Sequence, residues 1–347
     1  MKKITVSAPG KLMLFGEHAV VYGRPCIVTA VGQRMRATVE LLDKPVFELE
    51  APDVKVTGYK KPMDQLGVDD IPKGAKFVEM AVKNFMENVI LGNEVTPESA
   101  RSVDSGRGRH GDLARMTGIS ITTQSEFSSQ FGFGSSSAST VCVIKAISEI
   151  TGANLDNRAI FDLAYKTVLD IQGKGSGFDV AAAVYGGTLY YITPGKTIEP
   201  LNIESLPLIV GYSGIKADTV TLMNQVSELA QENPQMVEDI YNNIGKLVEQ
   251  AKVAILSKDW TTLGELMNSN QKLLENLGVS IEKFDNMILG AKAAGAYGAK
   301  LSGAGGGDCM IALSPEEKTQ AVKDGITSAG GQVIEVEASV QGARIED

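Results

Sequence analysis

Hydrophobic and polar residues alternate near the start of the chain, in the manner typical of β-strands. Residues 3–8 (KITVSA) are expected to form a strand that ends in a turn at Pro9-Gly10, and strand-like runs follow over 26–42 and 46–51. Over 75–91 (AKFVEMAVKNFMENVIL) the apolar residues recur at helical spacing, which predicts an amphipathic helix. The change of period indicates a protein of mixed strands and helices.

A long polar segment, residues 92–118, separates this helix from the next expected strand. It exceeds an ordinary connection, so we expect either an insertion without fixed structure or a mobile functional loop. Its arginines, Arg101, Arg107, Arg109 and Arg115, would either face solvent or hold an anionic ligand.

The remaining pattern is richer in helices. Apolar runs at 139–152 and 157–173 each predict one helix, and 218–289 is mostly helical. A strand, a glycine-rich turn and a second strand are expected over 296–313.

The length of 347 residues suits two domains better than one core. Three prolines within 193–207 indicate the passage between them. We therefore expect an N-terminal domain over 1–195, which includes the polar insertion, and a C-terminal domain over 196–347.

Composition and charge narrow the function. With 43% hydrophobic residues, 22% charged residues and a net charge of -9, the chain suits a globular protein without a broad surface for nucleic acid or anionic membranes. Cys26, Cys142 and Cys309 lack metal-ligand spacing. The chain also lacks a signal-peptide pattern and a membrane-spanning apolar run. These features predict a cytoplasmic protein with reduced thiols.

The stretch FGFGSSSAST, residues 131–140, joins an expected strand to an expected helix. It fits a phosphate cradle, because glycines permit close approach and a helix N-terminus directs N–H groups at an anion. It also falls one residue short of the nucleophile elbow G-x-S-x-G, although His18 and His110 both precede it instead of following it. A serine-rich helix cap without a ligand is the third interpretation.

Three further stretches combine glycines with polar side chains. Residues 9–23 (PGKLMLFGEHAVVYG) place Lys11, Glu17 and His18 around glycine turns. These side chains would either bind a polar substrate or form an ordinary surface pair. Residues 301–309 (LSGAGGGDC) carry more glycines than a hairpin needs, which indicates a backbone that touches a ligand.

The third stretch, residues 173–180 (GKGSGFDV), places Asp179 after a glycine loop. Asp179 would be either a helix cap or a general base. Asp170, nine residues upstream, could face the same cleft and hold a metal ion.

In their order and rough spacing these stretches resemble the signatures of the GHMP kinases, over residues 8–313, and 9–23 is most similar to the mevalonate kinases. The resemblance implies an α+β protein with a ribosomal-S5-domain-2-like, nucleotide-binding N-terminal domain and a ferredoxin-like C-terminal domain with added helices. It implies ATP and Mg²⁺ as cofactors, and mevalonate phosphorylated at its C5 hydroxyl in isoprenoid biosynthesis. It is also compatible with a homodimer.

The resemblance also implies roles by matching position. Asp179 would be the catalytic base, assisted by Lys11, and Ser136 with Asp170 would ligate Mg²⁺. The residues on the substrate side would be Glu17, His18, Ser213, Gly303 and Ala304. The residues on the ATP side would be Gly132, Phe133, Gly134, Ser135, Ser136, Ser137, Ala138, Ser139, Gly305 and Gly306.

Some positions depart from the mevalonate kinase pattern. Asp170 stands where glutamate is usual, and Ser137 stands where alanine is more usual. Residues 176–187 and 302–309 look more like phosphomevalonate kinase. The acceptor therefore stays open between mevalonate, phosphomevalonate and another small molecule such as a sugar.

A non-catalytic, metabolite-binding regulator is an alternative from another class. The presence of Lys11, Ser136 and Asp179 together argues against it, because a protein without catalysis has no need of all three.

Overall fold

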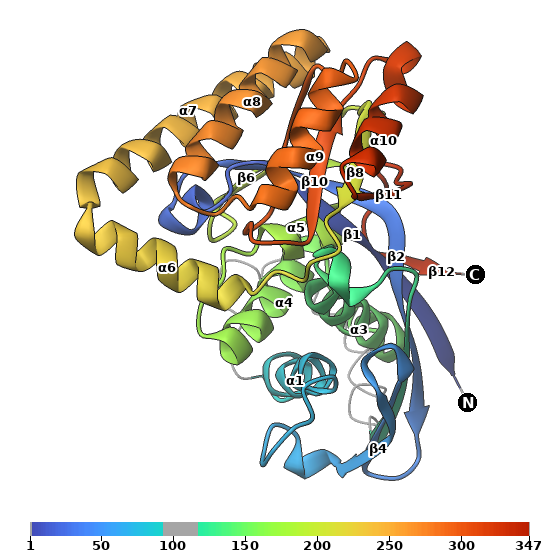
Figure 1. Cartoon of the computed structure of the whole chain (residues 1–347). Helices are drawn as coiled ribbons and strands as arrows, with labels where there is room; N and C mark the ends of the chain where they lie inside the picture. Colours follow the sequence, from blue (N-terminus) through green and yellow to red (C-terminus); the bar gives the residue numbers. More distant parts are fainter. Residues whose placement is uncertain (1, 93–116, 347) are drawn as a thin grey trace.

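The computed structural model describes residues 2–92 and 117–346, and two β-sheets organise them (Figure 1). Within these residues the larger sheet has eight strands in the order β12-β1-β2-β5-β3-β4, with β6 pairing with both β2 and β7. The smaller sheet has four strands, in the order β11-β8-β10-β9. Only β3 and β5 pair in parallel among these strands. The predicted α+β class is confirmed.

The larger sheet consists of β1 (Lys3–Phe15), β2 (Cys26–Leu42), β3 (Val46–Ala51), β4 (Val56–Pro62), β5 (Gly118–Ser125), β6 (Thr188–Ile192), β7 (Thr197–Pro200) and β12 (Arg344–Glu346). The smaller sheet consists of β8 (Leu208–Tyr212), β9 (Gly298–Ser302), β10 (Cys309–Leu313) and β11 (Gln332–Ile334). The α-helices are α1 (Lys76–Phe85), α3 (Ser135–Thr151), α4 (Asn157–Gln172), α5 (Phe178–Tyr185), α6 (Thr219–Glu232), α7 (Pro234–Ser257), α8 (Trp260–Asn276), α9 (Glu282–Ala293) and α10 (Thr319–Ser328).

Strand β1 does not end where the sequence predicts a turn. It continues through Pro9-Gly10, where the pairing with β2 shifts register, and it ends at Phe15. Gly10 lies against Phe133, where a Cβ atom on Gly10 would come within 3.1 Å of the Phe133 Cβ. Pro9 pairs with Arg34 and Gly10 with Val31, so the two extra residues at this shift, Gly32 and Gln33, belong to β2, and β1 continues to Lys11 without a turn.

The predicted helix over 75–91 is present in two forms. Residues Lys76–Phe85 are α-helical, and Met86–Ile90 continue as one π-helical turn. Such turns often occur at functional sites. The amide of Asn88 donates to the carbonyl of Asn84 at this junction (2.7 Å).

The helices separate into two groups (Figure 1). Helix α3 packs against β1 and β2, and α1, α4 and α5 pack around it. Helices α9 and α10 pack against each other and against the smaller sheet, and α7 pairs with α8, which lies along β9. The three cysteines are buried and free, as predicted. Within the described parts of the chain, no helix is long and apolar enough to cross a membrane.

The domain boundary after residue 195 stays a prediction. Two strands beyond it belong to the larger sheet, because β7 pairs with β6 and β12 pairs with β1. The C-terminal end of the chain therefore returns to the sheet in which the chain begins. Most of the polar insertion, with its four arginines, lies outside the described residues.

Candidate active site

The glycine-serine stretch forms a loop that leads directly into helix α3. Gly132 and Gly134 both have positive φ angles (72° and 78°), and Gly134 is the N-cap residue. The helix begins at Ser135, earlier than the apolar run predicted, so all three serines occupy its first turn. N–H groups in a first turn have no helical acceptor, and no acidic residue lies in this turn. This geometry suits an anion.

Strand β1 holds this loop through Lys11. The backbone N–H of Lys11 donates to the carbonyl of Phe133 (2.9 Å), and its ammonium donates to the carbonyl of Gly132 (2.8 Å). Phe133 is buried and packs against Phe127, with ring centroids 5.8 Å apart. A side chain at Gly132 would collide with the carboxylate of Asp308. The loop is therefore fixed from both sides.

Asp179 lies beside this loop, on the first turn of α5. Its carboxylate oxygen Oδ2 accepts a hydrogen bond from the hydroxyl of Ser137 (2.6 Å), and a Cβ atom on Gly134 would lie 3.7 Å from the Cβ of Asp179. The structure therefore brings together the predicted base and the predicted phosphate-binding turn, although they are about 40 residues apart in the sequence.

Lys11 lies half-buried near Asp179, but no ion pair joins the two among the described residues. Burial lowers the pKa of the Lys11 ammonium, while the carboxylates of Asp179 and Asp308 oppose that shift. The ammonium also lies 5.5 Å from the centre of the Phe178 ring. Lys11 thus supplies a half-buried positive charge next to the loop and the base.

Glu17, which the resemblance places on the substrate side, lies fully buried. Its carboxylate forms an ion pair with Lys300 of β9, and both side chains are fully buried. The second carboxylate oxygen accepts from the amide of Asn270 on α8 (3.1 Å). Since both oxygens have protein partners, Glu17 acts by joining the end of β1 to the strand that precedes the second glycine loop.

His18 is the centre of a γ-turn with unusual backbone angles (φ 60°, ψ -49°), closed by the N–H of Ala19 and the carbonyl of Glu17 (2.7 Å). Such strain is concentrated at functional sites. The Nε2 atom lies 2.8 Å from the carbonyl of Ala304. Nδ1 is buried without a partner among the described residues. Burial lowers the pKa of His18, so the ring is neutral near pH 7.

Packing explains some of the glycines in the second glycine loop, residues 303–307. A Cβ atom on Gly303 would meet nothing within 4 Å, so this residue borders open space. In contrast, a Cβ on Gly305 would collide with the carbonyl of Val279, and one on Gly306 would lie 2.6 Å from the Leu222 side chain. Packing against Val279 and Leu222 is therefore sufficient to explain why glycine occupies positions 305 and 306. Their predicted contact with ATP stays a prediction.

Asp308 ties the second glycine loop to the segment before α6. Its carboxylate accepts from the Lys216 ammonium and the Ala217 N–H (3.0 Å each). The hydroxyl of Ser213 donates to the Asp308 carbonyl (2.9 Å), and Ser213 is buried. Ser213 thus has a structural partner at the position where a substrate contact was expected.

The two predicted metal ligands are not in direct contact. Ser136 lies half-buried in the first turn of α3, whereas the Asp170 carboxylate on α4 accepts from Lys166 (2.6 Å) and Asn84 (2.9 Å). None of the hydrogen bonds of the described residues joins Ser136 to Asp170. No group of three or more His, Cys, Asp or Glu side chains forms a metal site in the described part of the chain.

Sequence reasoning missed several residues of this region. Four side chains outside the glycine-rich stretches each contact a predicted site residue or loop. They are Lys300, Asn270, Asn84 and Lys216. The only local signal was the position of Lys300, three residues before Gly303.

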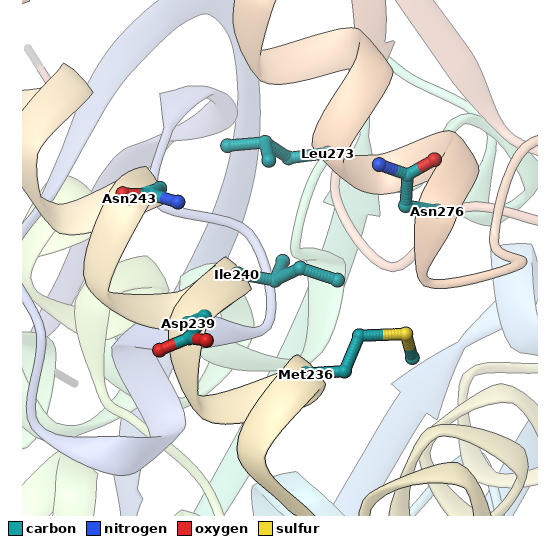
Figure 2. Close-up of a pocket in the computed structure, with 6 residues that line it drawn as sticks. All are labelled: Met236, Asp239, Ile240, Asn243, Leu273 and Asn276. Atoms are coloured by element: carbon teal, nitrogen blue, oxygen red, sulfur yellow. The ribbon is translucent and has the colours of Figure 1, made fainter. Parts of the chain in front are cut away.

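A surface hollow lies outside the predicted site. That hollow, about 740 Å³, lies between α7 and α8 and is lined by Met236, Ile240 and Leu273 with three polar residues (Figure 2). None of its lining residues belongs to the predicted site.

Comparison with known proteins agrees with this fold. The GHMP kinase N-terminal domain matches residues 100–187, and the GHMP kinase C-terminal domain matches residues 251–332. A crystal structure of the Methanococcus jannaschii mevalonate kinase superposes with a TM-score of 0.77 at 25% identity, covering 97% of this chain and 98% of that one.

Two curated relatives match over their full length. The proteins named mevalonate kinase from Thermococcus gammatolerans and Pyrococcus horikoshii are 36% and 37% identical, over 99% and 100% of this chain and 99% of each relative. The chain belongs to the GHMP kinase family. Within that family, the relatives it resembles over the whole length carry the name mevalonate kinase.

Proposed function

We propose that this chain transfers the γ-phosphoryl group of ATP to the C5 hydroxyl of mevalonate. One observation carries the proposal: a carboxylate, Asp179, is hydrogen-bonded to the first turn of the helix that is shaped to hold phosphate. Phosphoryl transfer requires an acceptor hydroxyl and a phosphate to meet in line. The names of the full-length relatives indicate the acceptor.

Asp179 orients the acceptor hydroxyl and takes its proton. Lys11 lies beside it as a half-buried cation, fixed on the Gly132 carbonyl. A positive charge at this point stabilises negative charge on the transferring group. The free N–H groups of the first turn of α3 bind the phosphates.

Mg²⁺ fits the side chains on this side of the site. Hydroxyl and carboxylate oxygens are its preferred ligands, and Ser136 and Asp170 supply one of each. The hydrogen bonds from Asn84 and Lys166 both fall on Oδ2 of Asp170, so Oδ1 is the oxygen that would hold the ion. When bound, Mg²⁺ neutralises charge on the phosphates.

The substrate side is built around His18 and the second glycine loop. With Nε2 donating to the Ala304 carbonyl, the unpartnered Nδ1 is an acceptor for a substrate hydroxyl. Glu17 supports this arrangement indirectly, through Lys300. Gly303 borders open space, where a small polar molecule can lie.

Phosphomevalonate is the second candidate acceptor. It is favoured by the sequence of residues 302–309, in which Asp308 holds Lys216 at the edge of the glycine loop. An acceptor with a phosphate would draw Lys216 away from Asp308. A role in isoprenoid biosynthesis, a cytoplasmic location and a homodimeric state accompany the proposal as predictions.

The test is ADP release by the purified chain with ATP, Mg²⁺ and mevalonate. We expect release that depends on mevalonate and is lost in Asp179→Asn. The absence of release with mevalonate, under conditions in which another acceptor supports it, would overturn the choice of acceptor. Release by Asp179→Asn at the wild-type rate would overturn the assignment of the base.

A further inference from the structure

We propose that Ser137 is a positioning residue that holds the carboxylate of Asp179 for catalysis. The inference rests on the proposed function and extends it to a residue that was expected only to line the ATP site. Ser137 is 2% exposed, and its hydroxyl donates to Oδ2 of Asp179 at 2.6 Å. A donor at this distance from a carboxylate forms a strong, charge-assisted hydrogen bond.

The position of Ser137 in the fold gives this bond its function. Ser137 is the third residue of α3, so its backbone belongs to the turn whose free N–H groups suit the phosphates. Its side chain reaches the first turn of α5, which carries Asp179. One residue therefore connects the phosphate-binding turn to the base, and it fixes the distance between the phosphoryl donor and the acceptor hydroxyl.

Asp179 has few other restraints. Its Oδ1 accepts only from the N–H of the next residue, Val180 (3.1 Å), among the hydrogen bonds of the described residues. Lys11 forms no ion pair with it there, since the Lys11 ammonium is bound to the Gly132 carbonyl. The Ser137 hydroxyl is thus the donor from another helix that selects one orientation of this carboxylate.

The orientation matters because each carboxylate oxygen has two lone pairs. Ser137 occupies one lone pair of Oδ2 and Val180 one of Oδ1, which leaves one on each oxygen for the acceptor hydroxyl. Without the Ser137 hydroxyl, the carboxylate can rotate about its Cβ–Cγ bond. Misplacement of a base by a fraction of an ångström to one ångström slows the chemical step.

The experiment compares Ser137→Ala with the wild type in single-turnover phosphoryl transfer, with steady-state KM values for ATP and for mevalonate. Alanine suits a helix interior, so α3 is retained. We expect the transfer rate to fall roughly 10- to 100-fold, with both KM values within about twofold of the wild type, because alanine keeps the backbone N–H groups of this turn and the Ser137 hydroxyl is already bound to Asp179.

Thr151→Val is the matched control. It removes another buried hydroxyl of α3, at the opposite end of the helix, where Thr151 donates to the Ile147 carbonyl (2.6 Å). We expect wild-type transfer rates from this variant. If Ser137→Ala transfers phosphate as fast as Thr151→Val, the proposed role of Ser137 is wrong.

The double variant Ser137→Ala/Asp179→Asn separates positioning from a general structural effect. If Ser137 acts through Asp179, the double variant transfers phosphate at the rate of Asp179→Asn alone, within about twofold. Losses that multiply would contradict the proposal. An inactive wild type would instead count against the proposed function, so the two failures are distinguishable.

Discussion

Replacing Lys300 by methionine tests the buried connection between the two glycine-rich regions. Lys300 and Glu17 form an ion pair in which both side chains are fully buried. Methionine retains the unbranched shape of lysine without its charge. The carboxylate of Glu17 would keep only the hydrogen bond from Asn270 (3.1 Å). The variant therefore leaves a buried negative charge without a positive partner.

The expected loss of stability is large. Removal of one partner from a fully buried pair costs about 3–5 kcal/mol, because the remaining charge stays desolvated. At about 2–4 °C per kcal/mol for a unit of 150–250 residues, Tm falls by roughly 6–20 °C. Burial lowers the pKa of Lys300, which shows that desolvation already opposes its charge and that Glu17 compensates for it.

Differential scanning calorimetry of three variants provides the assay. Lys300→Met should melt well below the wild type. The double variant Glu17→Gln/Lys300→Met should recover at least half of the loss, because glutamine still accepts from Asn270 and no charge remains buried. Lys323→Met removes an ion pair with Glu335, which is 78% exposed, and such surface pairs contribute about 1 kcal/mol or less.

Two results would refute this reasoning. A Tm for Lys300→Met as close to the wild type as that of Lys323→Met would show that the buried pair does not contribute as proposed. A double variant that melts no higher than Lys300→Met would show that the loss comes from side-chain shape, and not from the uncompensated charge.

Three further predictions concern the site. Asp179→Asn should lower kcat by roughly 100-fold or more with ATP affinity retained in isothermal titration calorimetry; a kcat near that of the wild type would contradict it. Asn84→Ala, which removes one of the two side-chain donors to the Asp170 carboxylate and leaves Lys166 as the other, should weaken Mn²⁺ binding in the presence of ATP about 10- to 100-fold, as read by electron paramagnetic resonance. His18 binds protons less well when folded, because burial lowers its pKa below 6.5. The unfolded chain therefore binds more protons between that lowered value and 6.5, so stability falls as the pH decreases through this window. The variant His18→Asn should lose this part of the acid dependence in urea titrations.

The parts of the site that could be predicted from the sequence are those set by neighbouring residues. Glycines followed by serines and an apolar run specify a loop and a helix N-terminus, and α3 follows that loop, although it begins at Ser135 and not at the predicted residue 139. In the same way, a glycine loop followed by an apolar run placed Asp179 at the start of α5. Both features depend on the backbone preferences of neighbouring residues, so they can be predicted from a short stretch of sequence.

The remainder depends on contacts between distant segments. The Glu17–Lys300 pair spans 283 positions and the Asn84–Asp170 bond spans 86, so no local pattern indicates either. The dipeptide Pro9-Gly10 predicted a turn, but β1 continues through it, and the irregularity in its pairing with β2 falls on Gly32 and Gln33 of β2. The excess of glycine at 303–307 predicted a backbone that touches a ligand. In the structure, Gly305 and Gly306 are crowded by Val279 and Leu222.

Steady-state kinetics with ATP and Mg²⁺, comparing mevalonate with 5-phosphomevalonate as acceptors, test the central claim most directly. The site described here and the full-length relatives predict a higher kcat/KM for mevalonate, with 5-phosphomevalonate as the product identified by ³¹P nuclear magnetic resonance. A higher kcat/KM for 5-phosphomevalonate, or no phosphorylation of either acceptor, would contradict the account.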